Sequence, residues 1–271
     1  MRERLKKAIS AIVWFLIKGS STVELDRAAG EARKRYHPRV TTRILYFLAF
    51  GTFNFPYEAK TGNPGEIPPA LIAAGYRRMI ANYLAEEILG RRIFADFLRV
   101  DPGGIFVTEL IEGPSPASIE ETQEALDEVR TFLWEVAGLS TWQFSARNPR
   151  SFSNIIGGLL IDGESCLAAS PLLLSFLLMM FTRQEIWAVF TLTGEFPPFD
   201  TVIFPRLENS LQELGDVPEE VWVWLHKCKK ATKAWHNSEP RPWEKLARAL
   251  FSFYRGLRDI QYGRELWNAR D

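Results

Sequence analysis

The sequence is short of the features that mark several large classes of protein. It holds only 2 cysteines, Cys166 and Cys228, and no C-x-x-C pair, which excludes a disulfide framework and favours a reducing, cytoplasmic setting. Its 33 basic residues balance 33 acidic ones, and this balance argues against a nucleic-acid-binding surface, which needs excess positive charge. The 3 histidines show no zinc-ligand spacing, and no H-E-x-x-H occurs.

Long apolar runs are also missing. The run from Ala8 to Ile17 is too short to span a bilayer, which takes about 20 residues, and no A-x-A cleavage site follows it. Residues 1–18 are therefore expected to form an amphipathic helix that docks on the protein or lies on a membrane surface as a peripheral contact. The uncharged stretch from Cys166 to Phe181 predicts a buried helix.

The chain is long enough for one large domain or two lobes. The charged residues 20–40 predict a solvated helix that ends near His37-Pro38. We expect a helical extension at residues 1–40, a small lobe at residues 41–113 and a helical large lobe at residues 114–271.

Several elements carry clear boundary signals. A helix is expected from Ala70 to Leu89, with Gly90 as its stop. The runs RIFADFLRV and IFVTELIEG are joined by Asp-Pro-Gly-Gly and predict a β-hairpin. Ser118 and Glu121 form a capping box that starts the next helix. Further helices are expected at 168–192, 204–214, 218–235 and 242–268.

The stretch NPRSFSNIIGGLLIDGES, residues 148–165, predicts a second hairpin. Gly157 and Gly158 suit a two-residue primed turn, because both central positions can take positive φ. That turn pairs Ile156 with Leu159 and, further out, Asn154 with Ile161.

The open end of this hairpin brings Asn154 close to Asp162. Two oxygen-bearing side chains suit Mg²⁺, which takes few protein ligands and fills its remaining positions with water and phosphate oxygens. The plainer interpretation is an ordinary turn with polar ends.

The order helix, hairpin ending in VTELIEG, capped helix, Asn, hairpin and Ile-Asp resembles the protein-kinase-like superfamily, in particular atypical kinases and aminoglycoside-phosphotransferase-like proteins. The resemblance implies an α+β, kinase-like two-lobed fold with a reduced N-terminal lobe and a mostly helical C-terminal lobe. It implies that Asn154 and Asp162 bind Mg²⁺ and that Glu86 or Glu87 is the helix glutamate. It also implies that ATP is held at its adenine by a hinge: Glu109, Leu110, Ile111 and Gly113.

The chain departs from that pattern at the catalytic positions. The catalytic aspartate should lie five residues before Asn154, where the sequence has Pro149, so no catalytic residue is identified. The glycine loop over the phosphates is missing, and Lys60 is a poor substitute for the phosphate-binding lysine because it lies in a turn-rich stretch.

The main functional hypothesis is a degenerate kinase-like protein, a pseudokinase or scaffold that has no evident catalytic base. Nucleotide binding is a further hypothesis for it. The alternatives are a weakly active Mg-ATP-dependent phosphotransferase and a membrane-associated helical interaction protein. The partner is then an unspecified protein or a small-molecule substrate, and the segment HKCKKATKAWH offers basic and aromatic side chains for it.

Overall fold

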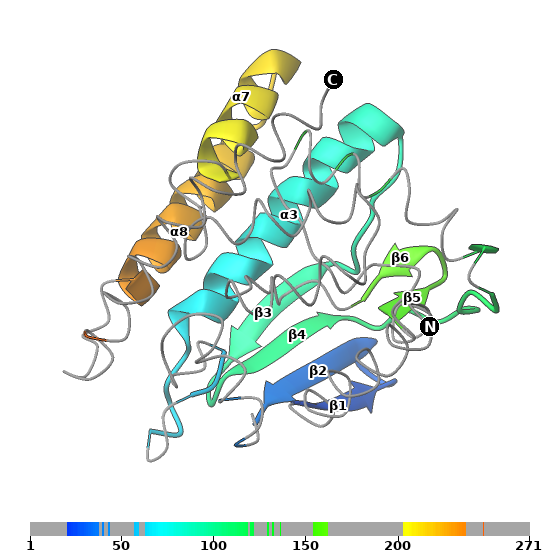
Figure 1. Ribbon diagram of the computed structural model, residues 1–271, viewed down its shortest axis with the longest axis vertical. Coiled ribbons are helices and arrows are strands. Elements are labelled where there is room, and N and C mark those ends of the chain that lie inside the picture. Colours follow the sequence, from blue (N-terminus) through cyan, green and yellow to red (C-terminus); the bar gives the residue numbers. More distant parts are fainter. Residues whose placement is uncertain are drawn as a thin grey trace, which may run out of the picture.

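The computed structural model describes residues 21–37, 57–59, 63–118, 154–161 and 203–236, and also residues 40, 43, 120, 121, 129, 132, 136 and 246. These parts form a mixed α+β structure with a four-stranded antiparallel sheet, a small hairpin and three helices (Figure 1). The helices expected at residues 1–18 and 168–192 lie outside the described residues, and of the helix expected at 242–268 the structure describes residue 246 alone.

The first hairpin corrects a prediction. Residues 20–40 were expected to be a helix, but β1 (Ser21–Asp26) and β2 (Glu31–Tyr36) pair in antiparallel register instead. The charges that suggested a solvated helix lie on a sheet edge, where opposite charges such as Glu24 and Arg33 are cross-strand partners. Gly30, with φ of 67°, supplies the left-handed residue that the connecting turn needs.

The hairpin predicted around Asp-Pro-Gly-Gly is confirmed. Strands β3 (Phe97–Asp101) and β4 (Ile105–Glu109) pair in antiparallel register, with Gly103 and Gly104 at positive φ in the turn. Because β2 also pairs with β4, the sheet has the order β1-β2-β4-β3. The small sheet therefore starts at Ser21, and the helical extension expected at residues 1–40 is wrong for residues 21–37.

Helix α3 (Pro69–Leu89) forms where it was expected. Pro69 fits the first turn, whose N–H has no helical partner, and Gly90 ends the helix with φ of 69° and an N–H donated to the carbonyl of Glu86. The helix crosses one face of the sheet, and α8 (Glu219–His236) packs along it on the side away from the sheet (Figure 1). Helix α7 (Phe204–Leu214) also contacts α3. We call α7 and α8 the rear helices, and each matches its predicted range to within a residue.

Burial on two sides explains the composition of α3. Toward the sheet, Leu71 and Ala74 pack with Tyr36 and Phe106. Toward the rear helices, the larger apolar cluster joins α3 with α7, α8 and the small hairpin, and its fully buried members include Ile80, Leu84, Ile93, Leu207 and Val221. Small alanines on both sides let the neighbouring layers approach closely.

Candidate functional site

One face of the four-stranded sheet is only partly covered. The side chains that share this face are set by the strand register and the alternation along each strand: Val23, Leu25, Ala32, Lys34, Phe106 and Thr108. Helix α3 covers the β4 side, where Phe106 packs against Leu71. On the edge strand β1, Val23 and Leu25 remain 57% and 54% exposed. We call Val23, Leu25 and Ala32 the open strip.

A lysine and a threonine border the open strip. Lys34 is the cross-strand partner of Val23 on one side and of Phe106 on the other, so it lies where the open strip meets the covered core. Its ammonium nitrogen lies 5.0 Å from the ring centroid of buried Tyr36. Thr108, the partner of Ala32, is buried. Lys60, considered from sequence, lies outside the described residues, and Lys34 was missed because its segment was assigned to a helix.

The predicted hinge begins at Glu109, the last residue of β4, and continues beyond the strand. We call residues 110–114 the connector. The N–H of Leu110 donates to the carbonyl of Gly30 at 2.8 Å, and the N–H of Glu109 donates to the carbonyl of Asp96 at 2.9 Å. The backbone donors of Glu109 and Leu110 are therefore used within the protein. Among the described residues no hydrogen bond engages the N–H of Ile111 or of Glu112, which leaves these two as candidate donors to a ligand.

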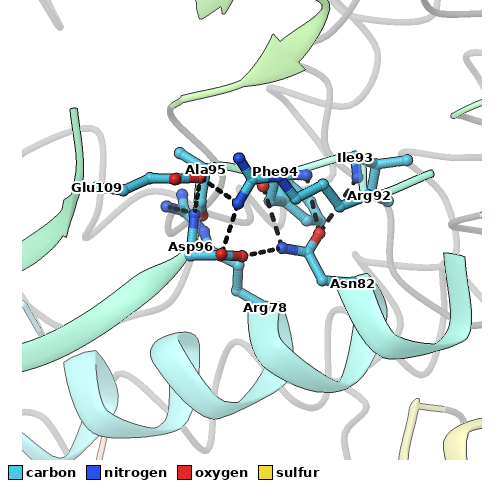
Figure 2. Close-up of polar contacts among 8 residues, drawn as sticks. All are labelled: Arg78, Asn82, Arg92, Ile93, Phe94, Ala95, Asp96 and Glu109. Carbon is cyan, nitrogen blue, oxygen red and sulfur yellow. Dashed lines mark hydrogen bonds and ion pairs between the residues drawn. The ribbon is translucent and has the colours of Figure 1, made fainter. Parts of the chain in front are cut away.

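A polar network fixes the start of the connector, and Figure 2 shows it. One carboxylate oxygen of Glu109 accepts from the N–H of Asp96 at 2.8 Å and pairs with Arg92 at 2.7 Å. Arg92 also pairs with Asp96 at 2.5 Å, and the amide of Asn82 on α3 donates to Asp96 at 2.9 Å. The end of β4 is thereby tied to α3 through charge-assisted hydrogen bonds.

The small hairpin at Gly157-Gly158 has the predicted geometry. Strands β5 (Ile155–Ile156) and β6 (Leu159–Leu160) pair in the expected register around Gly157 and Gly158, whose φ angles of 56° and 78° give the primed turn. The N–H of Ile161 donates to the carbonyl of Asn154 at 3.0 Å, which confirms that these two residues close the open end. Asp162, the second predicted metal ligand, lies outside the described residues.

The small hairpin is held from both sides. The N–H of Leu160 donates to the carbonyl of Ile93 at 2.8 Å, and the N–H of Ala95 donates to the carbonyl of Leu160 at 3.1 Å. On the turn side, the N–H of Gly157 donates to the carbonyl of Pro114 at 3.0 Å. The connector and Asn154 are thus parts of one hydrogen-bonded unit at the end of the sheet.

Buried Arg78 reaches this unit from α3. Its side chain is only 3% exposed, and its guanidinium donates to the carbonyl of Ala95 at 3.3 Å and of Ile161 at 3.5 Å. The same group lies over the rings of Phe94 and Phe106, 5.3 and 5.4 Å from their centroids. Sequence reasoning missed Arg78, although an arginine among the alanines and leucines of an apolar helix is the signal that marks it.

The predicted helix glutamates lie at the C-terminal end of α3. Glu86 and Glu87 are exposed in the last turn of α3. Burial raises the pKa of Tyr83, and the negative charges of Glu87 and Asp216 add to the rise, which places Glu87 toward the rear helices. A pairing of Glu86 or Glu87 with a phosphate-binding lysine stays a prediction, because Lys60 lies outside the described residues.

The magnesium site stays a prediction, because Asn154 is the one predicted ligand of the two that lies among the described residues. No group of three or more His, Cys, Asp or Glu side chains able to hold a metal is found among the described residues. The guanidinium of Arg78 lies close to Asn154, since it donates to the carbonyl of Ile161, and the N–H of Ile161 donates to the carbonyl of Asn154.

The opposite face of the sheet carries a set of ion pairs. Arg99 on β3 reaches Glu31 at 2.6 Å and Asp101 at 2.8 Å, and Arg33 also pairs with Asp101 at 2.8 Å. The hydrogen bond from Arg99 lowers the pKa of Glu31. Burial acts to raise the pKa of Asp101, but the hydrogen bonds from Arg33 and Arg99 outweigh it and lower the pKa. This network crosses the sheet and stabilises it rather than forming a site.

The chain matches no protein-family model, no curated protein and no solved structure. The kinase-like fold therefore stays a prediction. In the described part of the chain, no helix combines the length and the apolarity that crossing a bilayer requires.

Proposed function

We propose that this protein binds a nucleotide of the ATP type on the open strip of the sheet, as a kinase-like protein without an evident catalytic base. The observation that carries the proposal is the juxtaposition of Val23, Leu25 and Ala32 with Lys34 at their border. An exposed apolar surface is a platform for a planar base, and an ammonium group is a point-charge partner for phosphates.

The connector supports the same assignment. It leaves β4 next to Thr108, and the N–H groups of Ile111 and Glu112 are candidate donors to the edge of a base. The polar network of Asn82, Asp96 and Glu109 holds the start of this segment in place before any ligand arrives. Such preorganisation lowers the ordering cost of binding.

The proposed activity is binding, with a pseudokinase or scaffold role. Phosphoryl transfer relies mostly on positioning and charge stabilisation, so a base is not indispensable. The sequence nevertheless lacks both the aspartate expected at Pro149 and the glycine loop, which leaves the phosphates few partners. A feeble phosphotransferase is the alternative on the same site.

The test is a thermal-shift titration of the full chain with ATP. We expect Tm to rise with ATP concentration by mass action, and we expect Lys34→Ala to lose most of that rise. Removing one charged partner of a phosphate weakens binding about tenfold or more. Lys230→Ala is the matched control, because Lys230 is exposed on α8 and lies outside this face of the sheet.

A second candidate function rests on α8. His226, Lys227, Lys230 and Lys233 are exposed on this helix, and such a basic face suits an acidic protein partner in a scaffold without nucleotide. An absence of any Tm change at millimolar ATP, in the wild type and in Lys34→Ala alike, would favour this scaffold function over the nucleotide site.

A further inference from the structure

Strand β1 is the outermost strand of the four-stranded sheet, so one of its edges faces away from β2 (Figure 1). The direction of its backbone groups follows from one hydrogen bond on the other side of β2. The N–H of Leu110 donates to the carbonyl of Gly30, which makes Glu31 and Glu109 a non-hydrogen-bonded pair of the antiparallel ladder. Because the two kinds of pair alternate, Ala32 directs its N–H and C=O groups toward β4.

The same alternation settles which groups of β1 face outward. Since Ala32 bonds to β4, the next residue, Arg33, bonds to β1, where its partner is Glu24. Val23 and Leu25, on either side of Glu24, therefore direct their N–H and C=O groups away from the sheet. Among the described residues no hydrogen bond engages these outward groups. The side chains of the same two residues are the exposed members of the open strip.

This edge lacks the features that usually protect an edge strand. Strand β1 holds no lysine and no proline, and its register with β2 runs from Ser21 to Asp26 without a bulge. Its outward donors and acceptors lie beside exposed apolar side chains. Such an edge is a template on which a further strand can pair.

We propose that two copies of the chain pair through β1 in antiparallel orientation, with Val23 of each copy opposite the partner's Val23. Twofold symmetry is the commonest symmetry of protein dimers, and an antiparallel pair of identical strands satisfies it. The two sheets then form one continuous sheet across the dimer. This inference is independent of the proposed nucleotide site, because the pairing uses the edge of β1 and leaves the face of the open strip uncovered.

The charges on the other face of β1 select this register. Outward-facing residues pair with each other, so the twofold axis can also pass through Thr22, Glu24 or Leu25. An axis at Glu24 sets it opposite the partner's Glu24, and an axis at Leu25 sets Glu24 opposite the partner's Asp26; like charges directly opposite are destabilising. An axis at Thr22 leaves Leu25 without a partner within the strand. With the axis at Val23, Glu24 lies opposite the partner's Thr22, whose hydroxyl can donate to the carboxylate.

Sedimentation velocity of the full chain over a concentration series tests the proposal. A pair of short strands buries little surface, so we expect a weak dimer whose population rises through the micromolar range. Val23→Pro removes the central outward N–H, which the sheet of a single copy does not use, and proline is tolerated at such an edge position. We expect this change to weaken dimerisation by about tenfold or more.

Two outcomes of this measurement would overturn the proposal. One is a wild type that stays monomeric at several hundred micromolar, which would leave the edge to a strand of another protein. The other is a Val23→Pro variant that dimerises as well as the wild type, which would place the dimer contact elsewhere on the chain.

Oxidative cross-linking tests the register, and it decides the question even where Val23→Pro fails to fold. In a Cys166→Ser background, Val23→Cys sets the two new thiols on opposed residues whose Cα atoms lie about 5.5 Å apart, within the range of a disulfide. Leu25→Cys is the matched control: it is equally exposed, but the two copies of this position lie about 13 Å apart. We expect a disulfide-linked dimer of Val23→Cys and at least about tenfold less of Leu25→Cys. Equal cross-linking of the two variants would overturn the proposed pairing.

Discussion

The side-chain amide of Asn82 forms a pair of hydrogen bonds with the backbone of Phe94: Oδ1 accepts from the amide nitrogen at 2.9 Å and Nδ2 donates to the carbonyl oxygen at 3.0 Å. The same oxygen also accepts from the N–H of Ile93 at 3.2 Å, and the same nitrogen donates to Asp96. Both protons and both lone pairs of the amide are therefore in use. This one residue attaches the segment before β3 to α3.

Asn82→Ala should destabilise the protein by about 3 kcal/mol, because it leaves buried N–H and C=O groups of the segment before β3 without partners. Urea unfolding of both proteins gives the difference in free energy. Glu86→Ala, an exposed change on the same helix, is the control and should stay within about 0.5 kcal/mol of the wild type. Equal losses in the two variants would show that the hydrogen bonds of Asn82 are not the cause.

Gly75→Ala should be destabilising although alanine is the better helix former. The added methyl group would overlap the ring of Phe97, and that ring is held by a stacked contact with Phe106 at 5.0 Å and an edge contact with Tyr76 at 6.1 Å. Overpacking costs roughly 1–3 kcal/mol, which exceeds the gain of about 1 kcal/mol in helix propensity.

A double-mutant cycle checks the cause of that loss. Phe97→Leu vacates the far edge of the ring, so Gly75→Ala should cost at least about 1 kcal/mol less in that background than in the wild type. Additive losses of unfolding free energy would mean that the added methyl group strains something other than the ring.

The acid stability of the sheet should depend on Asp101. The pKa values of Asp101 and Glu31 lie below their ordinary values of 3.8 and 4.5, so both carboxylates contribute stability that is fully present above those values. That stability is lost as pH falls through the lower, folded-state values. Asp101→Asn should lower the free energy of unfolding by about 1 kcal/mol at pH 7 and show a shallower loss below pH 4. Parallel pH profiles for the two proteins would contradict this role.

Several elements could be predicted from sequence because each has a strong local signal. They are the β3–β4 hairpin, the turn at Gly157-Gly158, α3, α7 and α8. Gly-Gly between β-formers fixes the register of Ile156 with Leu159, and Gly90 marks the end of α3. The capping box is confirmed in part, since the N–H of Glu121 donates to Ser118 Oγ at 3.1 Å. The carboxylate of Glu121, however, accepts from the N–H of Ala117 rather than from that of Ser118.

The first hairpin could not be predicted in the same way, because its signal is not local. The side chains of β1 and β2 are largely charged, and their strand conformation depends on pairing with β4, which lies about seventy residues later in the chain. Lys34 enters the candidate site only through that pairing. Arg78 likewise gains its role from carbonyls of Ala95 and Ile161, which no pattern within α3 indicates.

Cys228 should be unreactive in the folded protein. Its thiol is fully buried on α8 and donates to the carbonyl of Ala73, and burial raises its pKa to about 11. In a Cys166→Ser background, labelling of Cys228 by a thiol reagent at pH 8 should therefore require α3 and α8 to separate. The labelling rate should rise at least a hundredfold in denaturing urea. The neutral thiol also contributes stability below its ordinary value of 9.0, which is lost as pH rises toward 11. Fast labelling of the native chain would show that the α3–α8 contact opens readily.

Gly113 should be the most sensitive position of the connector. Its φ of 151° is unfavourable for other residues, and a methyl group there would lie 3.0 Å from the Cα and 3.2 Å from the nitrogen of Gly157. Backbone atoms cannot rotate away, so Gly113→Ala has to separate the connector from the small hairpin. We expect it to cost about 2–3 kcal/mol, the sum of backbone strain and lost contact, and to weaken ATP binding about tenfold because the connector moves.

Gly158→Ala provides the matched control. Gly158 also has positive φ, at 78°, but nothing lies within 4 Å of an added methyl group, so this change carries the backbone strain of about 1 kcal/mol without the collision. Urea unfolding and ATP titration of both variants separate the two contributions, since only Gly113→Ala combines the larger loss of stability with weaker binding. If the two variants behave alike, the contact between Gly113 and Gly157 does not position the connector. The candidate donors on Ile111 and Glu112 would then have to be held by the two hydrogen bonds of the connector, from Leu110 to Gly30 and from Gly157 to Pro114.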